Sequence, residues 1–183
     1  MPSLPVKHRL VRRNLLRGAV GLLPLIALPR ILKAATPERR IAFLHTHTGE
    51  TVDVVYSEND DYLPDALAEI DRVCRDFRTG TVHPIDPALL DLLNDVQQAA
   101  GKAGRFEIIS AFRSPATNHM LGKAGSGVAD RSLHLTGQAI DVRLPGVRTL
   151  DVQRIALERA GGGVGYYPDS DFVHLDTGRV RRW

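Results

Sequence analysis

The stretch SLHLTGQAIDVRL, residues 132–144, contains a carboxylate in the middle of a run of β-forming residues. Residues 138–144 combine apolar and β-branched side chains in a short segment that predicts a strand. Asp141 lies inside this strand, and an unpaired charge in an apolar environment costs a large free energy. The carboxylate therefore needs a partner, which can be an arginine, a set of backbone N–H donors or a metal ion.

Short strands and amphipathic helices are predicted on both sides of this stretch. Runs rich in β-forming residues predict strands at residues 41–46, 51–56, 106–111, 138–144, 164–167 and 172–176. Apolar periodicity and capping residues such as Asp86 and Thr149 predict helices at residues 63–78, 86–101 and 149–160. The first two strands should form a hairpin, and residues 112–133 should form a loop.

The order of these elements does not alternate between strand and helix, which excludes a doubly wound parallel sheet. A length of 183 residues suits one domain with a substantial core. We therefore expect a single α+β domain over residues 36–183, in which a small antiparallel sheet is flanked by helices.

The basic residues of the chain are concentrated near its N-terminus. Residues 1–35 contain seven basic residues and no acidic residue, so the remainder has 17 basic and 21 acidic residues. An acidic body lacks the basic surface by which proteins bind nucleic acid, and we expect no nucleic-acid partner.

The N-terminal segment has the layout of a secretory signal. Arg12 and Arg13 precede an apolar run at residues 18–28, which Pro24 interrupts and which is short for a transmembrane span. The arginine pair resembles the twin-arginine export signal. We expect residues 1–35 to be a twin-arginine-type signal peptide that meets the inner membrane only during export. An uncleaved N-terminal anchor and a cytosolic amphipathic leader are the alternatives.

Two other features have simple structural interpretations. The chain has a single cysteine, Cys74, so it forms no intramolecular disulfide, and the apolar pattern around Cys74 predicts a core position. His45 and His47 share one face of the first predicted strand. Because no third ligand lies nearby in the sequence, a polar hairpin face is favoured there over a metal site.

A second candidate histidine, His174, lies in the strand predicted at residues 172–176. Together with His134 and Asp141 it would form a set of two histidines and one carboxylate, which in a catalytic zinc site leaves a fourth position open. Zinc lowers the pKa of a water molecule in that position toward neutrality. On spacing alone, an ion pair of Asp141 with Arg143 or Arg113 remains an alternative.

Four motifs of this chain carry a resemblance to a known family: SAFRS at residues 110–114, SLHLTGQAID at 132–141, GGVGYYP at 162–168 and FVHLDTG at 172–178. With them, the chain resembles the YcbK-like murein endopeptidases (murein endopeptidase K) of the D-Ala-D-Ala metallopeptidase group, from residue 47 to residue 183. The resemblance implies the hedgehog/DD-peptidase fold. It also implies that His134, Asp141 and His174 bind zinc in a periplasmic enzyme that cuts peptide crosslinks of peptidoglycan.

The resemblance also suggests roles for three further residues. In the wider group, the arginine that corresponds to Arg113 binds a substrate carboxylate or a polarised carbonyl oxygen, for which the guanidinium fork is suited. A structural salt bridge of Arg113 is the alternative. A general base is needed as well. We favour Asp171, three residues before His174, over Asp176, which shares a strand face with His174 and could instead orient it.

The glycine-rich strand before His174 allows two interpretations. Gly163, Gly165, Tyr166 and Tyr167 could line a cleft, where a flat backbone and aromatic edges suit an extended peptide. Equally, the glycines could form a turn while the tyrosines belong to the core.

Two functions of different classes follow. The leading one is a zinc hydrolase, an endopeptidase or a carboxypeptidase, that acts as a monomer on peptidoglycan stem peptides. As an endopeptidase it would cut bonds between two diaminopimelate residues or between D-Ala and diaminopimelate. The alternative is a non-catalytic module of the same fold, in which zinc stabilises a surface that binds peptidoglycan or a protein.

Overall fold

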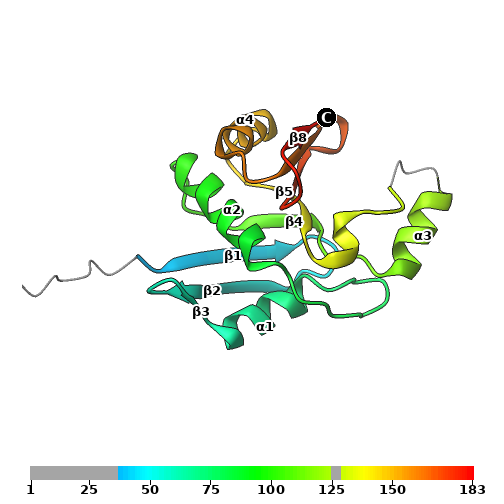
Figure 1. Cartoon of the computed structure of the whole chain (residues 1–183), viewed down its shortest axis with the longest axis horizontal. Coiled ribbons are helices and arrows are strands. Elements are labelled where there is room, and N and C mark those ends of the chain that lie inside the picture. Colours follow the sequence, from blue (N-terminus) through cyan, green and yellow to red (C-terminus); the bar gives the residue numbers. More distant parts are fainter. Residues whose placement is uncertain (1–36, 125–128) are drawn as a thin grey trace, which may run out of the picture. The chain divides into compact units, whose positions relative to one another are not determined.

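The computed structural model describes residues 37–124 and 129–183, and the signal peptide expected at residues 1–35 lies outside them. The described residues belong to one compact unit that begins at Ala35. Four α-helices and an eight-stranded sheet make up its described part, which confirms the expected α+β class. Figure 1 follows these elements from β1 in blue to β8 in red.

The sheet has the strand order β3-β2-β1-β4-β5-β7-β6-β8. Its strands are β1 (Arg39–His45), β2 (Thr51–Glu58), β3 (Asp61–Tyr62), β4 (Phe106–Ser110), β5 (Ala139–Arg143), β6 (Gly163–Tyr167), β7 (Phe172–Asp176) and β8 (Arg181–Arg182). Neighbouring strands are antiparallel, except that β1 pairs with β4 and β6 with β8 in parallel. The sheet is thus mixed, whereas an antiparallel sheet was expected. It is also larger than expected, because β3 and β8 are too short to leave a sequence pattern.

The helices cover parts of this sheet. They are α1 (Pro64–Val73), α2 (Pro87–Ala99), α3 (Pro115–Lys123) and α4 (Thr149–Arg159), with two 3-10 turns, η1 (Leu133–Thr136) and η2 (Pro168–Ser170). Helix α1 packs along β2, while α2 contacts β1 and α4, and α4 contacts β6 and β7 (Figure 1). Among the residues that the structure describes, no helix has both the length and the apolar character needed to cross a bilayer.

Helix α1 ends five residues before its expected end at residue 78. A backbone hydrogen bond holds the ends of the loop that follows together, since the Asp76 amide donates to the Thr81 carbonyl at 3.0 Å. Phe77, which continues the apolar period of the helix in sequence, stacks on His47 with a ring-centroid distance of 4.4 Å. The periodicity therefore extends beyond the helix because Phe77 packs on the β1 hairpin.

Helix α3 lies in the segment that was expected to be a loop. The Ser114 hydroxyl accepts the Thr117 amide, and Pro115 occupies the first helical turn. Both are helix-start signals that the sequence contains. Helix α3 nevertheless has only a weak apolar stripe, which is the reason that periodicity does not reveal it.

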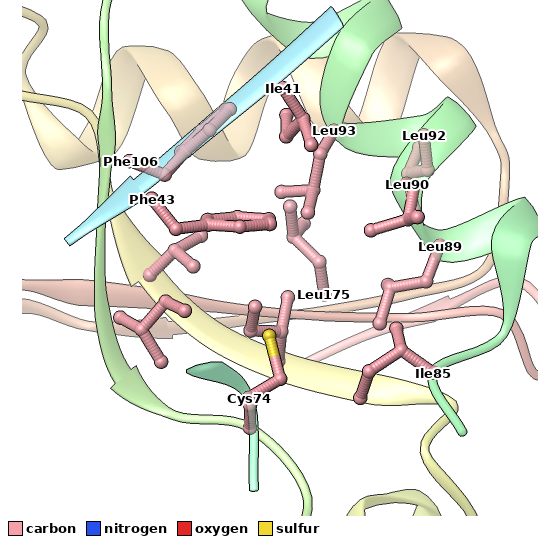
Figure 2. Packing of buried hydrophobic residues seen from close by; sticks show 14 of the residues in the cluster. Ile41, Phe43, Cys74, Ile85, Leu89, Leu90, Leu92, Leu93, Phe106 and Leu175 are labelled. Carbon is pink, nitrogen blue, oxygen red and sulfur yellow. The ribbon is translucent and has the colours of Figure 1, made fainter. Parts of the chain in front are cut away.

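The hydrophobic core packs α2 against one face of the sheet. The predicted stripe of α2 is buried, with Leu89, Leu90 and Leu93 fully enclosed. Figure 2 shows these leucines around Phe43 of β1 and the buried, free Cys74. The core position predicted for Cys74 is therefore confirmed.

Strand alternation separates the core from the opposite face of the sheet. On β7, Val173 and Leu175 join the core cluster, while His174 lies between them and points the other way. On β5, Ile140 and Val142 belong to the same cluster on either side of Asp141. Both strands thus present polar side chains, Asp141 on β5 and His174 and Asp176 on β7, to the face that lies away from the core.

Candidate metal centre

The register of the sheet brings Asp141 and His174 together. Asp141 on β5 lies directly opposite His174 on β7 in an antiparallel pair, so the two side chains are close neighbours on one face. His134 comes from the η1 turn, where its carbonyl accepts the Arg113 amide at 3.0 Å. Gly137 ends that turn with φ of 68°, and a Cβ atom there would lie 2.1 Å from the Pro84 carbonyl oxygen.

Three ligand atoms of these residues converge. The distance from Asp141 Oδ1 is 2.8 Å to His174 Nδ1 and 3.4 Å to His134 Nε2, and the two nitrogens are 3.2 Å apart. In a tetrahedral site with metal–nitrogen bonds of about 2.0–2.1 Å, ligand atoms are separated by about 3.3 Å. The spacing of the three atoms therefore suits a single metal ion.

The hydrogen-bond partners fix the tautomer of His134 and restrict that of His174. His134 Nδ1–H donates to the Ala111 carbonyl at 2.6 Å, whereas His174 has a carboxylate beside each ring nitrogen, Asp141 Oδ1 at 2.8 Å from Nδ1 and Asp176 Oδ2 at 3.0 Å from Nε2. When the proton of a neutral His174 lies on Nε2 and is donated to Asp176, the two nitrogens that face each other both carry lone pairs. Two lone pairs and a carboxylate oxygen at this distance repel one another unless a proton or a cation lies between them. The donor set therefore fits a metal ion bound at this point.

The electrostatics of the three residues reflect the same crowding. Burial lowers the pKa of His134. Burial acts in the same direction on His174, but hydrogen bonds to Asp141 and Asp176 outweigh it and raise the pKa of that imidazole. For Asp141, burial would raise the pKa of the carboxyl, and the two neighbouring histidines outweigh it so that the pKa falls well below its usual range.

Asp176 supports His174 from behind. Its carboxylate is fully buried and accepts the Gly163 and Gly178 amides, at 3.0 and 2.9 Å, as well as the His174 ring. Arg181 closes the arrangement with N···O distances of 3.0 and 2.7 Å. Since all of these donors engage the carboxylate, Asp176 is placed to hold a ligand in orientation rather than to take a proton from substrate or water.

Arg113 is the arginine that lies beside the ligand set. Its Nη2 atom is 3.7 Å from Asp141 Oδ2, and its buried Nε atom has no partner. Burial lowers the pKa of Arg113, and the Asp141 carboxylate partly offsets this. Arg143, the other candidate partner of Asp141, instead binds Glu107 at 2.6 Å. Arg113 lines the cavity beside the ligand set, where its guanidinium group is positioned to bind a substrate oxygen.

The structure does not bring Asp171 to this set. Its carboxylate accepts the Thr149 hydroxyl and lies 3.4 Å from Arg143, and its side chain is 64% exposed. Asp171 lines a different, open depression beside α4. The turn η2 ends at Asp171 with φ of 49°, which directs the chain into β7 only after this residue. The base role assigned to Asp171 from its spacing therefore lacks geometric support.

A cavity of about 370 Å³ opens over the three ligand residues. It is lined by Arg113, Ala129, Arg131, Ser132, Leu133, His134, Asp141, Tyr167, Phe172, His174, Arg181 and Trp183. Tyr167 thus faces the cavity, while Tyr166 is half-buried against the core.

Sequence reasoning missed Trp183, Arg181 and Arg131 as residues of the site. Trp183 reaches it because Gly165 leaves room: a Cβ atom at residue 165 would lie 2.7 Å from the indole ring. The ring centroid of Trp183 is 5.2 Å from that of His174. Two features of the sequence could have indicated this position of Trp183: it is the single tryptophan of the chain, and the strand before His174 contains a glycine.

His45 and His47 remain apart from this centre. His45 Nδ1 accepts the His47 amide, and both rings contact Phe77. Within residues 37–124 and 129–183, the set of His134, Asp141 and His174 is the one group of ligand-type side chains that converges on a common point. The two histidines do not share a polar strand face as expected, because His45 is buried at the end of β1 and His47 lies in the exposed turn that follows.

Comparisons with known proteins extend over almost the whole chain. The chain is 38% identical over 175 residues to the peptidoglycan L,D-endopeptidase MepK of Escherichia coli (strain K12), an alignment that covers 94% of this chain and 96% of the relative. It is 40% identical over 151 residues to the probable peptidoglycan L,D-endopeptidase MepK of Haemophilus influenzae, covering 81% of each. Among solved structures, the L-Ala D-Glu endopeptidase ChiX of Serratia marcescens matches with a TM-score of 0.34 and 23% identity, over 42% of this chain and 62% of that chain.

A family model agrees with these relatives and confirms the resemblance that the four motifs indicated. The Peptidase M15_2 model, described as peptidoglycan L,D-endopeptidase MepK, matches residues 33–183. That range contains the three converging residues, Arg113 and the strand that carries Tyr167. The chain therefore belongs to the Peptidase M15_2 family, together with the MepK endopeptidases.

Proposed function

We propose that the protein is a zinc-dependent endopeptidase that hydrolyses peptide crosslinks of peptidoglycan. One observation carries the proposal: two imidazole nitrogens and the Asp141 carboxylate oxygen converge within 2.8–3.4 Å at a cavity that also exposes Arg113. Two histidines and one carboxylate are the ligands of several zinc peptidases, in which a fourth position stays open. The names of the relatives supply the substrate class.

The protein's own residues divide the work of such a site. Zinc, when bound by His134, Asp141 and His174, supplies a Lewis acid that polarises a carbonyl group and activates water near neutral pH. The Ala111 carbonyl and Asp176 hold the two imidazoles in the tautomers that binding requires. Arg113, which lines the cavity, offers its guanidinium group to the carbonyl oxygen of the bond to be cut, where negative charge develops.

The crosslink we propose as substrate joins two diaminopimelate residues. The relatives are named L,D-endopeptidases, which describes a bond between an L-configured and a D-configured centre. A bond between two diaminopimelate residues has that configuration, whereas the bond between D-Ala and diaminopimelate joins two D-centres. The arginines Arg113, Arg131 and Arg181 at the cavity suit the carboxylates of such a substrate.

We also propose that residues 1–35 direct the chain to the periplasm by twin-arginine export, and that it acts there as a monomer. The arginine pair and apolar run of the leader support the route, and a cell-wall substrate requires an exported enzyme. Replacing Arg12 and Arg13 by lysine should leave the precursor in the cytoplasm, and normal periplasmic levels would contradict the route.

Digestion of purified sacculi tests the enzymatic proposal. The purified protein with equimolar zinc should release stem-peptide fragments whose masses identify hydrolysis between diaminopimelate residues. The same protein treated with a chelator should release none, and added zinc should restore the activity. A zinc-loaded protein that binds sacculi without altering their mass profile would instead be the non-catalytic binding module.

A further inference from the structure

Hydrolysis of an amide needs a proton donor for the leaving amine, and the cavity holds few groups that can supply one. Of the residues that line it, Asp141 is the one carboxylate, and it belongs to the metal set. The three arginines are not proton donors of this kind, because a guanidinium group in a protein keeps its protons. Asp176 is fully engaged by its donors, and Asp171 lies outside the cavity.

Among the lining residues that the structure describes, two hydroxyl groups remain, those of Ser132 and Tyr167. The Ser132 oxygen accepts the His134 amide and helps to shape the η1 turn. A phenol is a far stronger acid than an aliphatic hydroxyl, and its anion is a far better leaving base. Tyr167 is therefore the one lining side chain outside the metal set that can both give up and recover a proton.

Tyr167 is held rigidly at the cavity. It lies opposite Phe172 in the pairing of β6 with β7, and the two rings stack with a centroid distance of 4.6 Å and an interplanar angle of 18°. The stack fixes the plane of the phenol ring, since a flat side chain has few torsions left to vary.

Trp183 fixes the remaining freedom of the hydroxyl. Its Nε1–H donates to the Tyr167 oxygen at 2.9 Å, and an indole nitrogen is a donor only. The phenol oxygen must accept in this bond, so its own hydrogen is directed elsewhere. Within the described ranges, 37–124 and 129–183, no side chain or carbonyl accepts that hydrogen. The O–H group is left to a ligand in the cavity.

We propose that Tyr167 donates its proton to the amine nitrogen of the scissile bond as that bond breaks, an inference that rests on the proposed function. The carbon–nitrogen electron pair moves to nitrogen, a new N–H bond forms, and the phenol becomes a phenolate. The attacking water gives its oxygen to the new carboxylate, one proton to the phenolate and its other proton to the released amine, so the tyrosine is regenerated and the products are a carboxylate and an ammonium group. Trp183 is a positioning residue, because its N–H orients the phenol and stabilises the phenolate oxygen.

Tyr167→Phe tests this role, because phenylalanine keeps the stack on Phe172 and removes only the hydroxyl. We expect kcat on a crosslinked stem peptide to fall by roughly 100-fold or more, as expected for lost general-acid help. The matched control is Tyr166→Phe, at the neighbouring tyrosine that packs on the core and does not line the metal cavity. Its kcat should stay within about twofold of the wild-type value. Trp183→Phe should give an intermediate loss.

A substrate that needs no proton on its leaving group separates proton donation from a structural effect. With a p-nitrophenyl ester of the same acyl peptide, Tyr167→Phe should match the wild-type rate within about threefold. An equal loss on ester and amide would overturn the proposal in favour of a role in shaping the site. Amide turnover by Tyr167→Phe within about twofold of wild type would overturn it as well.

Binding gives a readout that does not depend on turnover. Trp183 is the single tryptophan of the chain, so its fluorescence reports on the cavity. The dissociation constant of the stem tripeptide product, titrated this way, should be equal in Tyr167→Phe and wild type, with equal zinc content by elemental analysis. A loss of affinity as large as the loss of rate would make Tyr167 a binding residue and refute proton donation. If the wild-type protein cuts no crosslink, the proposed function fails and this inference fails with it.

Discussion

Asp171 and Asp176 lie on either side of His174 in the sequence, but their side chains differ in burial and in hydrogen-bond partners. Asp176 is fully buried, accepts two backbone amides and binds both Arg181 and the His174 ring. Asp171 is mostly exposed and contacts Thr149 and Arg143. One carboxylate is part of the metal centre, and the other belongs to the surface beside α4.

The difference shows how strand geometry decides the use of a carboxylate. Residues two apart on a strand share a face, so Asp176 reaches the imidazole of His174 directly. Asp171 precedes the strand at a left-handed turn position, and that turn directs it toward α4. Their spacing in the sequence made both acids candidates for the general base. The backbone places only Asp176 beside His174.

Removing the histidine between the two acids should have the largest effect. His174→Ala deletes one of three ligands, so we expect loss of stoichiometric zinc and of all measurable hydrolysis. The same outcome is expected for His134→Ala and Asp141→Ala. Elemental analysis and sacculus digestion measure both quantities. His119→Ala, an exposed histidine on α3, is the control and should keep zinc and activity. Full zinc content in any ligand variant would remove that residue from the site.

Asp176→Asn should have a smaller effect on the same site. The amide cannot serve as a charged acceptor for the His174 ring and Arg181, so the imidazole loses its fixed tautomer. We expect zinc affinity to weaken by about 10- to 100-fold, with activity largely restored at saturating zinc. Competition with a chelator of known affinity measures this. A variant that keeps wild-type affinity but has no activity at saturating zinc would show that Asp176 acts on the substrate instead.

A third carboxylate, Asp76, extends the comparison to stability. Burial would raise the pKa of Asp76, but hydrogen bonds from the Ser114 hydroxyl and amide and from neighbouring groups lower it to about 2. A lowered folded-state pKa stabilises the protein above the unfolded value of about 3.9, and this stabilisation is lost as the pH falls toward 2.

Asp76→Asn should therefore unfold more easily than wild type by about 2 kcal/mol at pH 6, and the difference should shrink between pH 4 and pH 2. Urea unfolding of the zinc-free proteins at several pH values measures it. Asp95→Asn, at an exposed position of α2, is the control and should show no such convergence. A difference that stays constant down to pH 2 would contradict the role of the Asp76 charge.

Asp171→Asn should have the smallest effect. Because the carboxylate lies outside the cavity, we expect kcat within about threefold of wild type and unchanged zinc content. Its exposed bonds to Thr149 and Arg143 contribute little to stability, since surface ion pairs are weak. Steady-state kinetics on a crosslinked peptide decides the point. A fall of 100-fold or more would restore Asp171 as the general base and would require β7 and η2 to rearrange around the substrate.

The sequence predicts those parts of the fold that depend on neighbours along the chain. Helix α2 follows from its Asp86 cap and its leucine stripe, and the α+β class follows from the order of the elements. The end of α1 is not predictable, because Phe77 continues the apolar period but packs on His47 across the hairpin. Contacts between distant segments decide such cases.

The same limit applies to the candidate site. The ligand set of His134, Asp141 and His174 follows from the resemblance of the motifs rather than from spacing alone, and the pairing of β5 with β7 brings two of them face to face. Trp183 has no motif of its own, and only the close approach to Gly165 places its ring beside His174. The position of Asp171 depends on one left-handed turn residue, which no periodicity predicts.

The arginines give the cavity a positive charge excess, whereas the chain beyond residue 35 has an excess of acidic residues. Beyond residue 35 the chain has more acidic than basic residues, yet Arg113, Arg131 and Arg181 outnumber the carboxylates around the metal set. A divalent cation would increase this local excess of positive charge. The cavity thus has the opposite charge balance to the chain as a whole, which favours anionic groups of a ligand at this point. Added salt should weaken that attraction, because it screens charges that face the solvent.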